Sequence, residues 1–219
     1  ADFKHAKAEG WTALMLASAE GHLNVVKYLL SQGDDYKLRN IEGHTALMLA
    51  TLKGQLHVVK VLLDRGAEYN LQNQNGVTAL MMAAHEGHLD IVQVLLDRGA
   101  DCKIQNQSAN TALTLAALKG HLDIVQVLLT QDPNLNHQNK AGFTPLMAAA
   151  LEGHLEVVEH LLSREADPTF QTTDGRTALT IATQKEYLGV AQLLHSAVDR
   201  LNHENKNYGD SNSFSWPIP

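Results

Sequence analysis

The chain has 219 residues and a formal charge of −7, because 24 acidic side chains outnumber 17 lysines and arginines. An acidic chain without a basic block is a poor match for a phosphate backbone, so we expect no nucleic-acid partner. A single cysteine, Cys102, excludes a disulfide framework and a cysteine-rich zinc site. No apolar run approaches the roughly 18 residues that a membrane span needs, so we also expect no membrane contact.

A period of 33 residues runs through the chain without an insertion or deletion. The triplet Thr-Ala-Leu or Thr-Pro-Leu recurs at Thr12, Thr45, Thr78, Thr111, Thr144 and Thr177. A Gly-His-Leu triplet and a pair of β-branched residues recur with the same step, as at His88 and Ile91. Such self-similarity is typical of a repeat array, in which each unit packs only against its neighbours.

Each repeat reads as two short helices and a loop. In the second repeat Gly43 suits a tight turn, and Thr45 is positioned to cap a helix over residues 46–53. Gly54 then ends that helix. A second helix is predicted over residues 56–65, and its single apolar face carries Leu56, Val59, Leu62 and Leu63. The polar residues that follow form a projecting, hairpin-like loop.

Neither helix is long enough to be stable alone in water, so the repeats must stack to bury their apolar faces. The period places six repeats in residues 7–198, with starts near 7, 40, 73, 106, 139 and 172. Residues 1–6 are expected to be the end of a preceding repeat, and residues 199–219 a polar tail with an aromatic and proline end.

The fifth repeat resembles the ankyrin repeat family most clearly. Residues 142–154 read Gly-Phe-Thr-Pro-Leu-Met-Ala-Ala-Ala-Leu-Glu-Gly-His, close to the family pattern Gly-x-Thr-Pro-Leu-His-x-Ala-Ala-x-x-Gly-His. The resemblance covers about residues 1–198. It implies an all-α solenoid of stacked helix-turn-helix repeats with projecting hairpin-like loops. It also implies a non-catalytic module that binds a protein or peptide through its concave face and loop tips.

Several positions depart from the family pattern. The first histidine is replaced by Met15, Met48, Met81, Met147 or a threonine, which removes a local hydrogen bond. Ala109 stands where the other loops have glycine, at a cost of about 1 kcal/mol if its backbone is left-handed. Glu186 and Tyr187 replace Gly-His in the sixth repeat. The polar outer helix of that repeat is what a C-terminal cap requires.

The register at the start of the chain predicts more chain upstream. Ala1 and Asp2 align with Ala100 and Asp101, inside the loop between two repeats. We therefore expect at least one further repeat before Ala1. The alternative is a degenerate N-terminal strand of a processed protein.

Positions that vary between repeats are the candidates for partner binding. They lie at a loop tip, between the turn glycine and the threonine, and at the end of the first helix. The residues are Trp11, Ile41, His44, Leu52, Val77, His85, Asn110, Leu118, Phe143, Leu151 and Arg176. Aromatic and leucine side chains in a polar surround are typical interface anchors. Alternatively, they are isolated surface residues or pack under their own loops.

The residue after the varying helix-end position alternates strictly in charge. It is Glu20, Lys53, Glu86, Lys119, Glu152 and Lys185. Neighbouring repeats could pair across this row, although exposed pairs contribute only about 0–1 kcal/mol each. Either partner recognition or a solvated charge ladder that prevents self-association would explain the pattern.

Motifs for chemistry are missing from the sequence. His22, His88, His121 and His154 lie one repeat apart, and stacked helices are separated by about 8–10 Å. Zinc needs every ligand at about 2 Å, so these histidines are interpreted as structural and no metal site is expected. The chain has no phosphate-binding glycine loop and no nucleophile elbow. We therefore expect no enzymatic activity and no cofactor.

Two functions fit this sequence. The first is a cytoplasmic module that binds another protein. The alternative is a targeting or substrate-recruiting module from a larger enzyme or from a secreted bacterial effector, which would act in the host cytosol. The residues do not identify the partner.

The tail is predicted to be flexible from Leu201 to Ser213, because it is rich in asparagine and poor in apolar residues. Phe214 and Trp216 near its end resemble a short docking peptide. We expect a monomer. Contact of Phe214 and Trp216 with a neighbouring copy is the alternative, and the end of the tail could also be linker sequence.

Overall fold

A computed structural model describes residues 8–33, 35–132 and 134–211. After a short 3-10 turn, η1 (Ala8–Gly10), inner and outer helices alternate along the chain. The inner helices are α1 (Ala13–Ala19), α3 (Ala46–Leu52), α5 (Ala79–Glu86), α7 (Ala112–Lys119), α9 (Pro145–Glu152) and α11 (Ala178–Gln184). The outer helices are α2 (Leu23–Ser31), α4 (Leu56–Asp64), α6 (Leu89–Asp97), α8 (Leu122–Gln131), α10 (Leu155–Ser163) and α12 (Leu188–Ser211). The described residues contain no strand, so the all-α prediction is confirmed.

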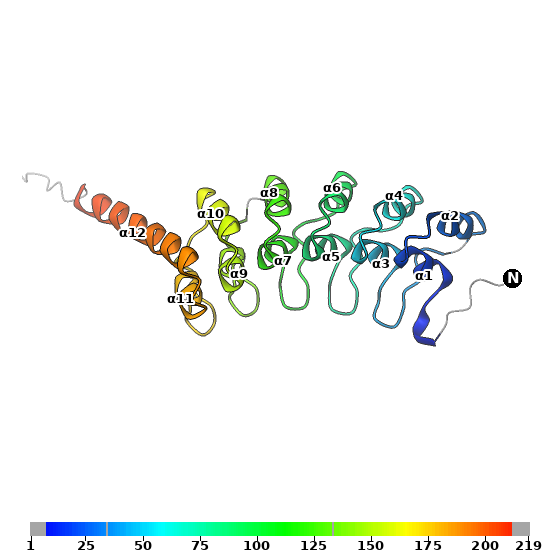
Figure 1. Cartoon of the computed structure of the whole chain (residues 1–219), viewed down its shortest axis with the longest axis horizontal. Coiled ribbons are helices and arrows are strands. Elements are labelled where there is room, and N and C mark those ends of the chain that lie inside the picture. Colours follow the sequence, from blue (N-terminus) through cyan, green and yellow to red (C-terminus); the bar gives the residue numbers. More distant parts are fainter. Residues whose placement is uncertain (1–7, 34, 133, 212–219) are drawn as a thin grey trace, which may run out of the picture.

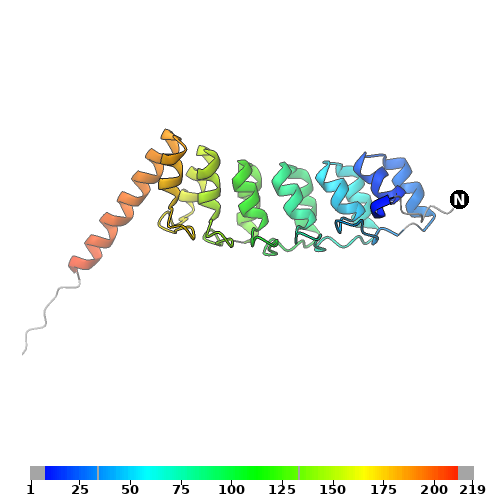
Figure 2. The ribbon, with the colours of Figure 1, turned by 90° about the horizontal axis from the view of Figure 1, so that it is seen from below.

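The helix pairs stack side by side into one extended, bowed array (Figure 1). Outer helices occupy the convex side, and the inner helices and loops occupy the concave side. Seen from below, the pairs follow one another in sequence order, and α12 projects away from the end of the array (Figure 2). Each inner helix packs against its own outer helix and against the described inner helices next to it in the stack.

Threonine caps set the start of every inner helix. The Thr45 hydroxyl accepts a hydrogen bond from the Met48 N–H at 3.3 Å, and the other five threonines make the same contact. The predicted cap is therefore confirmed. The two helices expected over 46–53 and 56–65 each end one residue earlier, at Leu52 and Asp64.

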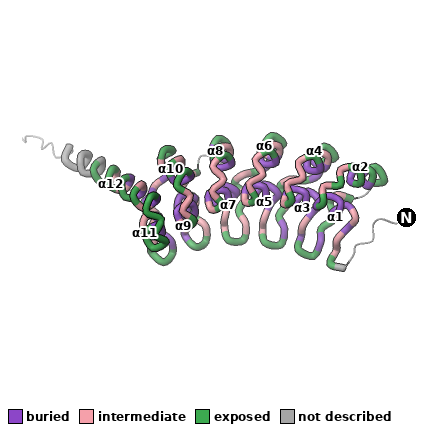
Figure 3. Tube along the Cα trace, viewed as in Figure 1, coloured by how far each residue is buried: buried purple, intermediate pink, exposed green. Residues whose placement is uncertain are grey.

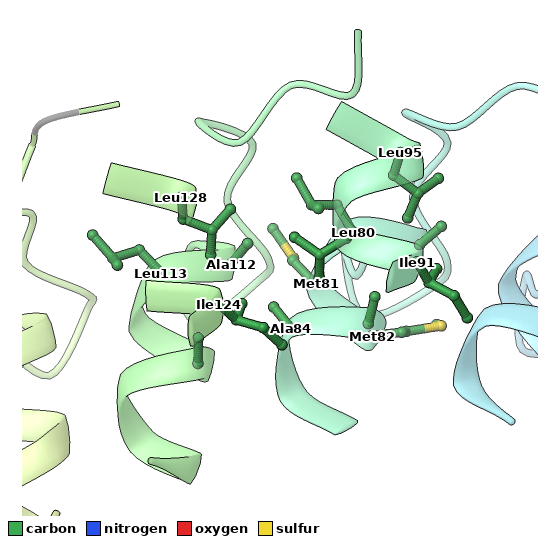
Figure 4. Close-up of a cluster of buried hydrophobic side chains, with 14 of the residues drawn as sticks. Leu80, Met81, Met82, Ala84, Ile91, Leu95, Ala112, Leu113, Ile124 and Leu128 are labelled. Atoms are coloured by element: carbon green, nitrogen blue, oxygen red, sulfur yellow. The ribbon is translucent and has the colours of Figure 1, made fainter. Parts of the chain in front are cut away.

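The core is one continuous apolar layer that repeats with the helix pairs. The inner helices carry most of the buried residues, whereas the loop tips are exposed (Figure 3). Apolar side chains of α5 and α6 lie beside those of α7 and α8 (Figure 4). Where the family has its first histidine, the methionines are fully buried, so they add apolar contact.

Two departures from the family pattern adopt the left-handed backbone that glycine normally provides. Ala109 has φ 60° and Glu186 has φ 61°. The strain expected at Ala109 is therefore present. Beside Glu186, the Tyr187 ring lies over Gly153, where a side chain on that glycine would meet Tyr187 Cδ1 at 2.8 Å. Tyr187 thus takes the place that a histidine occupies over the glycine in earlier pairs.

The prediction of a flexible segment after Arg200 is wrong for residues 201–211. Helix α12 continues without a break from Leu188 to Ser211. Its apolar stripe includes the buried Val190, Leu194 and Ala197 and continues to the half-buried Leu201. No proline interrupts this stretch, so a helix that starts against α11 can propagate outward. Phe214 and Trp216 lie outside the described residues.

Candidate partner-binding surface

Asparagine side chains shape each loop on the concave side. Asn40 Oδ1 accepts hydrogen bonds from the N–H groups of Glu42 and His44, at 3.1 and 2.8 Å. The equivalent bonds recur around Asn73, Asn106 and Asn139, and Thr172 has this role in the last loop. The asparagines are therefore structural, as the turn preference of this residue predicts.

Successive loops are joined by one backbone hydrogen bond per repeat. Gln74 N–H donates to the Glu42 carbonyl at 3.0 Å. Bonds at the same register follow from Gln107, Lys140 and Thr173. Glutamine side chains add further links, as from Gln72 Nε2 to the Gln105 carbonyl at 2.9 Å. The loops therefore form a laterally bonded row with a fixed backbone.

Several predicted binding residues are already engaged by the neighbouring loop. His44 Nε2 lies 2.9 Å from Asn73 Nδ2, and Asn139 Nδ2 donates to Asn110 Oδ1 at 2.8 Å. The Arg176 guanidinium lies 5.9 Å from the centre of the Phe143 ring, within reach of a cation–π contact. Among the apolar binding candidates, Ile41 is the one that is exposed, with 58% of its surface accessible.

The apolar helix-end residues are half-buried rather than fully exposed. Leu52 and Leu151 pack against the core, as do Trp11 and Val77 near the loops. Leu118 is half-buried as well. These side chains leave part of their surface accessible, but they also support the stack. His85 at the same position is half-buried, with Nδ1 2.7 Å from Glu86 Oε1.

The alternating charges beside them are exposed in every repeat. This helix-end charge row comprises Glu20, Lys53, Glu86, Lys119, Glu152 and Lys185. Among the described residues, no ion pair joins a lysine of the row to a glutamate of the row. The binding residues predicted from the sequence do not include these six. The strict alternation of their charge along the repeats is the sequence signal that singles them out.

The periodic histidines hold successive helix pairs together. His121 Nε2 lies 3.1 Å from the His85 carbonyl, and His154 Nε2 lies 3.0 Å from the Leu118 carbonyl. Gln55 Nε2 makes the same link to the Ala19 carbonyl at 3.3 Å. Each ring or amide also fills the space over a glycine of the pair before it. This arrangement agrees with a structural role for the histidines.

Cys102 lies at the wall of a hollow of about 170 Å³. Burial, and secondarily the charge of Asp132, raises the pKa of the thiol above its ordinary value. A raised pKa lowers the thiolate fraction at neutral pH and makes a poor nucleophile. The site therefore offers no activated thiol.

The repeat architecture agrees with that of a known protein family. A family model described as ankyrin repeats, in three copies, matches residues 1–73, 33–106, 65–139 and 131–205. The chain belongs to the ankyrin repeat family. Ankyrin repeats are generally protein–protein interaction modules, and their fold is typically non-catalytic. No match was found among curated proteins.

Within the described ranges, no helix is both long enough and apolar enough to cross a bilayer. Helix α12 has the length, with 24 residues, but its outer part is polar.

Proposed function

We propose that this chain is a non-catalytic binding module whose concave side recognises another protein or peptide. The observation that carries the proposal is the pairing of two kinds of accessible group on that side. One is the helix-end charge row, whose lysines and glutamates form no ion pair with one another among the described residues. The other is the apolar group at the loops and helix ends, with Ile41 the most open.

The partner surface is expected to be apolar where it meets Leu52, Leu118 and Leu151, and charged where it meets the row. Apolar anchors contribute most of the affinity of an interface, whereas a rim of charges sets orientation and association rate. Because the row alternates in sign, a partner shifted by one repeat would face like charges. The row would therefore fix the register of the bound chain.

The test compares charge changes on the concave and convex sides. The first variant carries Lys53→Glu and Glu152→Lys in the row. The matched control carries Lys60→Glu and Glu159→Lys, which lie exposed on the outer helices of the same two pairs. Both double variants keep the net charge and the composition, so a difference between them reports on the face alone.

The measurement is affinity capture from a lysate, followed by titration of each captured protein with the purified variants. We expect at least one protein to be lost or weakened about tenfold by the row variant and kept by the control. Circular dichroism verifies that both variants fold. If both retain the same proteins with equal affinity, the concave side is not the binding surface.

A second candidate is a targeting module in a larger enzyme or secreted effector, with its activity outside residues 1–219. The uncovered apolar end of the first helix pair, described below, favours this reading because it fits a longer array. We propose a cytoplasmic location for this chain, or the host cytosol if it is part of a secreted effector.

A further inference from the structure

The first helix pair has an apolar residue exposed at a position that is buried everywhere else. Val25 in α2 has 48% of its surface exposed. At the same register in the next four outer helices, Val58, Ile91, Ile124 and Val157 are each 1% exposed. The residue type is the same throughout, so the difference comes from what covers the position.

The last helix pair shows which neighbour provides the cover. Val190 in α12 occupies the same register and is 2% exposed, although no described helix pair follows it. A preceding pair is therefore enough to bury this position, and a following pair is not needed. Val25 has a following pair, α3 and α4, but among the described residues no helix pair precedes it.

Three more residues of the first pair are more exposed than their equivalents in later pairs. Tyr28 is 55% exposed, whereas Val61 and Val94 at its register are half-buried against the core. Ala13 and Leu16 in α1 are half-buried, whereas their equivalents in the last pair, Ala178 and Ile181, are fully buried. Ala13, Leu16, Val25 and Tyr28 together define the first-pair end face.

The opposite end of the array is built differently. Apart from Tyr187 and Leu188, the exposed side chains of residues 178–203 are polar, among them Thr183, Gln184 and Gln192. A polar outer surface is what a terminal repeat needs in water, and the first-pair end face does not have one. The last helix pair thus has the polar surface of a terminal repeat, whereas the first helix pair has the apolar composition of an interface between repeats.

We propose that the first-pair end face packs against a further ankyrin repeat, carried on the same polypeptide before residue 1. The occupant follows from continuity with the joints inside the array, where the same four register positions are covered by the helix pair that precedes them. The proposal rests on these uncovered positions and is independent of which face binds a partner.

An added repeat tests whether the face accepts a helix pair. Residues 73–99 placed directly before Ala1 restore the 33-residue spacing between Thr78 and Thr12. We expect this extended chain to unfold with a Tm higher by about 4 °C or more than residues 1–219. No increase would overturn the proposal.

A pair of matched substitutions localises the effect. Val25→Ala is expected to change the Tm of residues 1–219 by no more than about 1 °C, and to lower that of the extended chain by about 4 °C. Val58 is already buried in residues 1–219, so Val58→Ala should lower the Tm of both chains by the same amount. Equal effects of Val25→Ala in the two chains would show that the added repeat does not cover the face.

Two further measurements separate the occupants in the natural protein. The intact mass of the protein from its own cells should exceed that of residues 1–219 by at least one repeat. A mature start at or next to Ala1 would overturn the proposal. Sedimentation of residues 1–219 should show a monomer. A dimer that dissociates on Val25→Glu would place a second copy on the face and would equally overturn it.

Discussion

The loop row and the helix-end charge row follow the same 33-residue register on the concave side, but the stack uses them differently. In the loops, side chains such as Asn73 and Asn139 bond to their own backbone and to the neighbouring loop. At the helix ends, Lys53 and Lys119 are exposed, and no ion pair links them to a described residue of the row. Substitutions in the first row should therefore affect stability, and substitutions in the second should affect binding.

The largest loss is expected in the loop row, at Asn73. The change Asn73→Ala removes the acceptor for the N–H groups of Asn75 and Val77, and also the contact with His44. We expect the free energy of unfolding to fall by about 2–3 kcal/mol, measured by urea titration. Asn75→Ala, at an exposed position of the same loop, is the control and should cost less than about 0.5 kcal/mol. Equal losses would contradict a structural role for the loop row.

Opposite changes at two equivalent turns should have opposite signs. Ala109 has φ 60° where the other loops have glycine, so Ala109→Gly should stabilise the chain by about 0.5–1 kcal/mol. Gly76→Ala should destabilise it, because a Cβ there would lie 2.9 Å from the Gln107 backbone nitrogen. Urea titration measures both. A loss of stability in Ala109→Gly would show that the alanine methyl makes contacts that outweigh its strain.

A third prediction concerns a polar residue inside the stack. His160 stands in α10 where α4, α6 and α8 have valine, and its Nε2 is buried without a hydrogen-bond partner among the described residues. Burial, and secondarily the Arg164 charge, lowers the pKa of this imidazole below its ordinary value of 6.5. As the pH falls below 6.5, the unfolded chain binds a proton more readily than the folded chain, so stability is lost.

His160→Val removes this contribution. We expect the Tm of the variant to fall less than that of the natural chain between pH 7.5 and pH 5.5. All other side chains are the same in the two proteins, so their contributions cancel in the difference. Identical pH dependence of the two melting curves would refute the assignment.

The smallest effect on stability is expected in the charge row. Lys119→Glu interrupts the alternation between Glu86 and Glu152, but exposed charges contribute little to folding. We expect a change of less than about 0.5 kcal/mol in the free energy of unfolding by urea titration. A loss comparable to that of Asn73→Ala would mean that the row supports the stack, and it would then be a poor marker of the binding face.

Much of the fold could be predicted because its signals are local. A threonine before an apolar turn and a glycine after it define a short helix wherever they occur, and the left-handed backbone at Ala109 follows from its register alone. The length of α12 could not be predicted in this way. Its outer part has the composition of a loop, and it is helical because the inner part is held against α11.

The candidate site was less predictable for a related reason. A residue that varies between repeats, such as His44 or Asn110, can contact a partner or the next loop. The variation in the sequence is the same in both cases. The choice depends on whether Asn73 or Asn139 lies within hydrogen-bond distance, which requires the stacked structure.

The joints between helix pairs also bear on how quickly such a chain folds. The side-chain bonds that cross them link residues 28 to 36 apart, as from Gln72 to Gln105 and from His121 to His85. Adding repeats lengthens the chain without lengthening any of these loops. Folding slows as contacts become more distant in sequence. Because the sequence separation at each joint stays the same, we expect the entropic cost of forming a joint to be independent of the length of the array.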